Sequence, residues 1–203
     1  MVAQSAPGLL GGRRMKRLVA ALVLLTLSGT VASAEPAGSL QPSQAVSVGT
    51  FAYAMDGYLS STPAVLTGFD AAYDHHLTGS YGLRFRAGAV LLAVDEITGI
   101  APHGEAGPFR RIVLGPRAAL DASVLAGYYA GGLDHKELWK DHGGPTVMAE
   151  LALHVALTDW LHASVGGGYR LAWTPDEHIS DAGSSSDPFS SGPLLRMNLG
   201  WSF

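Results

Sequence analysis

Cysteine is absent from this sequence, charged residues are few, and no long apolar run follows the N-terminal segment. Without cysteine the chain has no disulfide framework, no thiol nucleophile and no lipid-modified N-terminal cysteine. Charged residues form only 15% of the chain, whereas hydrophobic residues form 47% and glycine occurs 26 times. A membrane-spanning helix needs about 18 or more consecutive apolar residues, so none is expected beyond the N-terminal segment.

The N-terminal segment has the parts of a secretory signal peptide. Lys16 and Arg17 form its positive region, residues 18–27 its apolar core, and Ala34 ends an Ala-Ser-Ala cleavage site. We expect residues 1–34 to be the signal peptide, with Met15 as an alternative start, and residues 35–44 to be a flexible leader. Removal of the basic residues in this segment leaves an acidic mature chain, which argues against nucleic acid as a partner.

The clearest pattern in the remaining chain is an alternation of apolar with small or polar residues between Thr146 and Trp173. Apolar residues occupy every second position through Leu157, and the pattern resumes at Leu161 after a short polar break. A period of two describes an extended strand with one apolar face. Each run is long enough to cross a bilayer as a tilted strand of about 9–11 residues. The stretch therefore predicts a membrane hairpin whose other face is small or charged.

The same alternation extends over residues 45–203 and predicts an all-β, eight-stranded antiparallel up-and-down transmembrane β-barrel. The expected strands are 45–54, 64–74, 80–94, 109–120, 123–131, 146–157, 161–173 and 193–203. Long connections then follow the first, third, fifth and seventh strands. The connection after the third strand is 95–108, which contains two prolines and three glycines. Short turns, one of them at Asp121, follow the other strands. Bacterial outer-membrane barrels show this asymmetry between short periplasmic turns and longer extracellular loops.

Aromatic residues are expected to form two girdles, one at each membrane interface. The girdle at the short-turn end would contain Tyr73, Tyr81, Trp160, Trp201 and Phe203, and the girdle at the other end Tyr53, Tyr58, Phe109, Tyr128 and Trp173.

The chain end carries the most specific motif, in which Leu195, Met197, Leu199, Trp201 and Phe203 alternate with other residues. With this final strand, residues 45–203 resemble the small eight-stranded OmpA/OmpX-type outer-membrane barrels. The resemblance implies the outer membrane of a Gram-negative bacterium as location. It also implies that the outer-membrane assembly machinery reads Trp201 and Phe203, and that lipids and lipopolysaccharide surround a monomer. A structural or interaction role through four extracellular loops follows, with no enzymatic activity.

The faces opposite the apolar ones should fill the interior, which in eight strands is just wide enough for side chains. Buried charges need partners, so we expect a hydrogen-bonded polar plug, with a narrow gated pore as the alternative. Its candidate residues are Asp70, Arg84, Arg86, Arg117, Glu150, His154, Arg170 and Arg196. Arginines outnumber carboxylates in this set, which leaves its charge unbalanced.

Two other functions remain as alternatives. His162 and Ser164 form a His-x-Ser pair that resembles PagL-type lipid A deacylases, and Glu177 would complete a triad in which histidine activates the serine. Against this, Val165 replaces the asparagine of that family, and the pair occupies the expected inner face near the end opposite Glu177. The second alternative is a soluble periplasmic lipocalin-like binder, in which the apolar faces would line a ligand cavity.

No cofactor is expected, and no resident metal. Four histidines, His103, His135, His142 and His178, fall in the predicted loops. Beside two of them, Asp134, Glu137 and Asp141 supply carboxylates that could join imidazole in binding a divalent ion. Because the spacing of these residues is not fixed, they are weaker evidence for a metal site than for acidic loops that meet ions bridging lipopolysaccharide phosphates.

Overall fold

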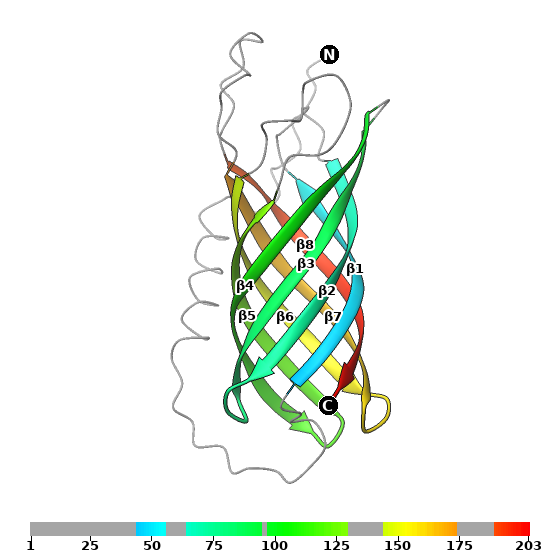
Figure 1. The fold of residues 1–203 in the computed structure, drawn as a ribbon, viewed down its shortest axis with the longest axis vertical. Coiled ribbons are helices and arrows are strands. Elements are labelled where there is room, and N and C mark those ends of the chain that lie inside the picture. The colour runs from blue at the N-terminus through cyan, green and yellow to red at the C-terminus, as the bar shows by residue number, and fades with distance from the viewer. Residues whose placement is uncertain (1–43, 56–63, 95–96, 130–143, 174–188) are drawn as a thin grey trace, which may run out of the picture.

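The computed structural model describes residues 44–55, 64–94, 97–129, 144–173 and 189–203. These form eight strands in one closed barrel in which each strand pairs antiparallel with its neighbours in the sequence (Figure 1). The strands are β1 (Gln44–Met55), β2 (Ala64–His76), β3 (Tyr81–Val94), β4 (Ile97–Gly115), β5 (Ala118–Tyr129), β6 (Gly144–Ala156), β7 (Leu161–Trp173) and β8 (Phe189–Ser202). In these residues there is no helix of the length and apolarity that a membrane span requires. The predicted fold class is confirmed.

The barrel closes between its first and last strands. The β1–β8 register runs from Ala45 opposite Ser202 to Tyr53 opposite Leu194. Beyond this ladder, Phe203 N–H donates to the Gln44 carbonyl at 3.0 Å, so the C-terminal residue still takes part in closure. Because every strand has two partners, the sheet has no free edge.

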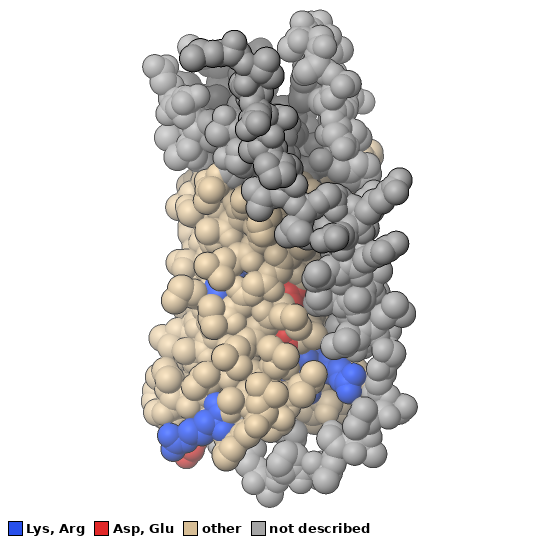
Figure 2. Space-filling view, turned by 180° about the vertical axis from the view of Figure 1, so that it is seen from behind, with Lys and Arg blue, Asp and Glu red and all other residues tan. Residues whose placement is uncertain are grey.

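The outer wall is apolar. Alternate residues of each strand turn outward and expose large hydrophobic side chains, including Val65, Phe69, Leu91, Leu151, Leu153, Val165, Leu195 and Met197. Figure 2 shows one side of this wall, where charged side chains are sparse and the basic ones lie mainly toward the short-turn end. A soluble protein would bury such a surface, whereas a membrane barrel presents it to lipid.

The turns after β2 and β6 are built alike, each by a threonine in the second turn position. The Thr78 side-chain oxygen accepts from Tyr81 N–H at 3.2 Å, and that of Thr158 accepts from Leu161 N–H at 3.0 Å. In both turns the backbone amide of the leucine before the threonine donates across the turn at 2.9 Å. These local bonds fix the register of two hairpins.

The predicted loop 95–108 is wrong, because most of it belongs to β4. Residues 97–108 continue the strand, and β3 and β4 are separated only by residues 95–96. Pro102 and Pro108 are exposed on the outer face. Pairing with β3 is continuous past both prolines, while the β4–β5 ladder is interrupted between Ala106 and Phe109. The strand thus accommodates Pro108 at the cost of local pairing with one neighbour.

Three further sequence-based expectations need correction. Asp121 lies within β5 and not in a turn, because the β4–β5 turn is at Pro116 and Arg117. Phe109 is only 1% exposed and faces the interior, and Tyr53 packs against the interior apolar cluster, so neither belongs to a girdle. The other predicted girdle residues in the described ranges lie on the outer wall or in the turns; Tyr58 lies outside those ranges.

Glycines make room for the largest interior side chains. Phe109 lies against Gly82, its cross-strand partner, where an added Cβ would come within 2.5 Å of the phenylalanine ring. Phe51 lies against Gly68 in the same way. An eight-stranded barrel has little interior width, so each pairing of an aromatic ring with a glycine lets the ring fill the core without pushing strands apart.

Candidate functional site inside the barrel

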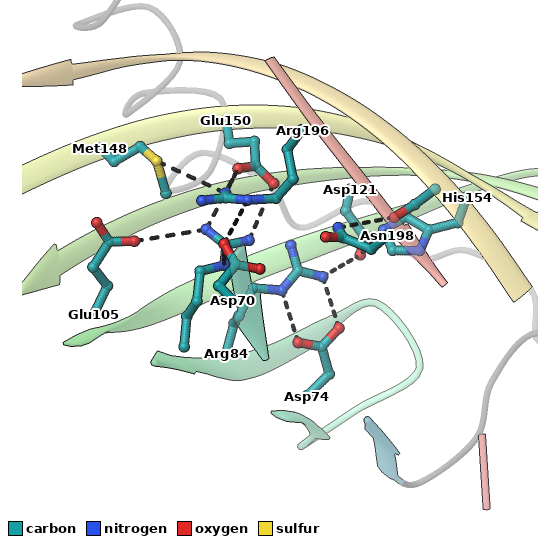
Figure 3. Close-up of polar contacts among 12 residues, drawn as sticks. Asp70, Asp74, Arg84, Glu105, Asp121, Met148, Glu150, His154, Arg196 and Asn198 are labelled. Carbon is teal, nitrogen blue, oxygen red and sulfur yellow. Dashed lines mark hydrogen bonds and ion pairs between the residues drawn. The ribbon is translucent and has the colours of Figure 1, made fainter. Parts of the chain in front are cut away.

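The interior holds equal numbers of buried arginines and buried carboxylates among the described residues. They are Arg84, Arg86, Arg111, Arg170 and Arg196, and Asp70, Asp74, Glu105, Asp121 and Glu150. All ten are at most 6% exposed. Ionised groups taken out of water need partners, and this balance supplies them. Figure 3 shows most of these side chains converging on the barrel axis from several strands.

The first tier lies nearest the short turns and is tightly bonded. Arg84 donates to both oxygens of Asp74 at 2.7 Å and to Asp121 at 2.9 Å. Arg111 donates to both oxygens of Asp121 at 2.8 Å, and His154 Nε2 lies 3.0 Å from the same carboxylate. Phe109 packs beneath both guanidinium groups, at 4.9 Å and 5.7 Å. Asp121 therefore joins three basic side chains from three other strands.

The arrangement of the first tier follows from strand register. Asp74 lies directly opposite Arg84 on β2 and β3, and Asp121 lies directly opposite Arg111 on β4 and β5. Each pair is ten residues apart in sequence and spans one of the short-turn hairpins. Neighbouring strands hold both members of each pair in place, which favours the bidentate geometry of strong arginine–carboxylate pairs.

The middle tier crosses the interior. Glu150 of β6 accepts from Arg86 at 3.3 and 3.4 Å, and it pairs closely with Arg196 of β8. Arg196 also lies 2.9 Å from Asp70 of β2. These contacts join strands on different sides of the barrel. Together with the first tier, they leave four arginines matched by four carboxylates.

The loop-side tier is loosely bonded and partly apolar. Glu105 faces Arg170 at 3.6 Å, Arg86 at 3.7 Å and His103 at 3.9 Å, all beyond good hydrogen-bond distance. The Arg170 guanidinium lies over the rings of Tyr53 and Tyr129, at 5.3 and 5.8 Å. An apolar cluster fills the same half of the interior: Phe51, Leu66, Val90, Ala101, Leu125, Met148 and Leu194.

Seven of the eight candidate plug residues face the interior: Asp70, Arg84, Arg86, Glu150, His154, Arg170 and Arg196. Arg117 does not, because it is exposed in the β4–β5 turn, and Arg111 occupies the interior position. The candidate set omits four interior residues that remove its apparent excess of arginine: Glu105, Asp121, Asp74 and Arg111. Two of them, Asp74 and Arg111, lie on faces that the alternation marks as interior. The other two were hidden by a predicted loop and a predicted turn.

The predicted deacylase pair is not arranged as a catalytic pair. Ser164 Oγ accepts a hydrogen bond from Asn198 at 3.2 Å, and His162 Nδ1 lies 3.3 Å from Ser202 Oγ. Both residues project inward, Ser164 at 8% exposure and His162 against Gly200. Neither side chain faces the lipid in which a lipid A substrate would lie. Glu177 lies outside the described residues.

Of the histidines and acids suggested as loop metal ligands, one lies in a strand and the others lie outside the described residues. His103 lies in β4 and is buried, so its assignment to a loop is wrong. His135, His142, His178, Asp134, Glu137 and Asp141 lie outside the described residues. Within the described ranges, no group of three or more such side chains is placed to hold a metal ion.

An apolar wall around a charged interior defines this structure as a small transmembrane β-barrel. No protein-family model matches the chain, and no curated protein matches its sequence. Solved structures with the same fold include Ail, the attachment invasion locus protein of Yersinia pestis (14% identity, TM-score 0.52). That match covers 81% of this chain and 100% of Ail. Neisserial surface protein A is also similar (9% identity, TM-score 0.59), covering 79% and 97% of the two chains.

These similarities confirm, at the level of fold, the predicted resemblance to small outer-membrane barrels. The predicted location in the outer membrane of a Gram-negative bacterium agrees with this fold and with the apolar outer wall.

Proposed function

We propose that this protein is a non-conducting outer-membrane barrel with a structural or interaction role, in which the charged tiers close the interior. The observation that carries the proposal is the bonding around Asp121, where Arg84, Arg111 and His154 reach one carboxylate across the barrel. A guanidinium released from such a pair would be left buried without a counter-ion, at a cost of about 3–5 kcal/mol. Closure at this tier is therefore stable against thermal opening.

Conductance of the purified barrel in planar lipid bilayers tests this closure. We expect current at the noise level, because the ion pairs of the first tier link side chains from β2, β3, β4, β5 and β6 across the interior. Regular single-channel steps from the wild-type protein would show that the interior is a pore. Asp121→Asn serves as a positive control for detection where it folds, since loss of the shared carboxylate loosens the tier.

With the interior closed, the surfaces left for a partner are the lipid-facing wall and the connections between strands at the loop end. We place the interaction role at the connections 56–63, 130–143 and 174–188, and drop the predicted loop after the third strand because β3 and β4 nearly meet. Loop exchange tests this role. Replacing each connection by a short Gly-Ser segment should abolish binding of cells to a partner surface while preserving the heat-dependent mobility of the folded barrel on SDS gels.

Assembly at the outer membrane is proposed to depend on the exposed terminal residues Trp201 and Phe203. Deletion of Phe203 should lower the amount of folded barrel in the outer membrane, while the purified variant should still fold in detergent. Equal amounts of the wild-type and truncated barrels in the outer membrane would show that Phe203 is not part of the assembly signal.

The two alternatives make different predictions. A deacylase would shorten lipid A in cells that express the protein, and we expect unchanged lipid A mass spectra because Ser164 and His162 have other hydrogen-bond partners inside the barrel. A soluble lipocalin-like binder would carry its apolar residues inward, whereas the exposed hydrophobic residues here lie outside. Fractionation should therefore recover the protein with membranes and not with the soluble periplasm.

A further inference from the structure

The loop-side tier contains buried polar side chains that lack hydrogen bonds. Among the described residues, none gives a hydrogen bond to the ring nitrogens of His103, the Thr146 hydroxyl, or Nε and Nη2 of Arg170. The three residues are only 6%, 2% and 5% exposed. An unsatisfied buried polar group costs about 1–3 kcal/mol, so three such residues in one region mark a place where a bound group or water would complete their hydrogen bonds.

The three side chains lie in one region of the inner surface. Arg170 and His103 both face Glu105, at 3.6 and 3.9 Å. Thr146 lies opposite Ala172 on the neighbouring strand, two residues from Arg170 on the same inner face. Such diagonal neighbours are within reach of long side chains. The cluster lies on the loop side of the two tightly bonded tiers, because Thr146 and Arg170 are near the ends of β6 and β7 that the long connections join.

The unsatisfied groups are mostly donors. Arg170 offers two N–H positions, Thr146 an O–H, and His103 one N–H when neutral and two when protonated. The unsatisfied acceptors nearby are Glu105 Oε2 and one nitrogen of a neutral His103. A group that accepts several hydrogen bonds and carries negative charge fits this set best.

We propose that the loop-side end of the barrel interior binds a small oxyanion, a phosphate or carboxylate group, through Arg170, His103 and Thr146. The guanidinium of Arg170 lies over the rings of Tyr53 and Tyr129, which orient it. Within the described part of the chain, the only ion pair of Arg170 is with Glu105, which also faces Arg86. Neutral His103 can donate one N–H to the anion. The charged groups around this histidine are Glu105, Arg170, Arg196 and Arg86, and its ring packs edge-on against Phe51.

Calorimetric titration of the purified barrel in zwitterionic detergent with inorganic phosphate, and separately with acetate, tests the proposal. We expect saturable binding, because the Arg170 guanidinium and the polar side chains beside it can donate to the anion. Arg170→Gln should weaken binding about tenfold or more, the equivalent of one charged hydrogen bond. Arg117→Gln, an exposed turn arginine, should leave it unchanged. Binding of phosphate alone or of acetate alone would identify which oxyanion the site prefers.

Absence of saturable binding by either anion to the folded wild-type barrel would overturn the proposal and show that water alone satisfies the cluster. Equal weakening by Arg170→Gln and Arg117→Gln would overturn it too, since the anion would then bind the surface. Neither result affects the proposed closure, because conductance is measured independently of anion binding.

A second measurement avoids removing any charge from the interior. Because the chain has no cysteine, Thr146→Cys introduces a single thiol next to Arg170. A negatively charged methanethiosulfonate should modify this thiol faster than a positively charged one, and phosphate should slow the reaction. Thr158→Cys, in an exposed turn, provides the intrinsic rate ratio of the two reagents. The same ratio at both positions would contradict an anion site.

Discussion

The two ends of the barrel interior hold their charges differently. Near the short turns, Arg84 and Arg111 donate to Asp74 and Asp121 at 2.7–2.9 Å. Toward the loop end, the basic groups around Glu105 lie 3.6–3.9 Å away. Burial does not explain the difference, because all of these carboxylates are at most 6% exposed.

Strand register explains much of it. In the first tier the two members of each bidentate pair occupy directly opposed positions on neighbouring strands. Arg170 and Glu105 come from β7 and β4, which are not neighbours. Arg86 and Glu105 are directly opposed but still 3.7 Å apart, because Arg86 reaches across the barrel to Glu150. Tight ion pairs thus form where register aligns two side chains and no competing carboxylate draws one away.

The largest expected effect is that of Asp121→Asn, which removes the carboxylate shared by Arg84, Arg111 and His154. Leaving buried basic groups unmatched should lower the free energy of unfolding by about 3–5 kcal/mol. Urea unfolding in lipid vesicles, followed by tryptophan fluorescence, measures the change. Asp159→Asn, in an exposed turn, is the matched control. Similar unfolding midpoints for the two variants would show that Asp121 does not stabilise the barrel through its buried ion pairs.

An arginine introduced on the outer surface of the barrel provides a reference cost for an unpaired charge. Leu151 follows Glu150 in the sequence but faces outward. Leu151→Arg should destabilise the barrel by about 2–4 kcal/mol if the position lies near the bilayer midplane, whereas Leu157→Arg, at the short turn, should cost at most about 1 kcal/mol. The same urea experiment compares them. Equal costs would contradict the assignment of the outer wall to lipid.

Glu150→Gln should have an intermediate effect. The carboxamide keeps one acceptor oxygen for Arg86 or Arg196 but loses the charge that both arginines share. We expect a loss of about 2 kcal/mol, the value of a hydrogen bond to a charged group. A loss as large as that of Asp121→Asn would place the main anchor of the interior in the middle tier.

Glu105→Gln should have the smallest effect, below about 1 kcal/mol, because Glu105 makes no short hydrogen bond to the basic groups that face it. The chemical change matches that at Glu150, so the pair isolates the effect of bond geometry. A larger loss at Glu105 than at Glu150 would show that the loop-side tier is tighter than its distances indicate.

The sequence predicts the barrel well because a period of two survives in almost every strand. Its main failure, β4, comes from applying a general rule about proline to residues 97–108. Alternation is present there, since His103 and Glu105 face inward and Pro102 and Pro108 outward. Proline removes one ladder bond at a time, and a strand paired on both sides can retain its place through the other neighbour.

The interior was predicted less completely than the wall. Alternation assigns Arg84, Arg86 and Glu150 to the interior, but it cannot show which arginine meets which carboxylate across the barrel. It also gives no sign of the apolar cluster around Phe51 and Leu125, because interior apolar residues disturb the expected contrast between faces. Partner choice depends on the register of strands distant in sequence, which emerges only when the barrel closes.

Double-mutant cycles compare the two regions most directly. The interaction energy between Asp74 and Arg84 should be set beside that between Glu105 and Arg170, using carboxylate-to-amide and Arg→Gln changes in the same lipid. Our account predicts coupling of about 1–3 kcal/mol for the first pair and below about 0.5 kcal/mol for the second. Equal coupling, or stronger coupling at Glu105, would contradict an interior anchored at the short-turn end.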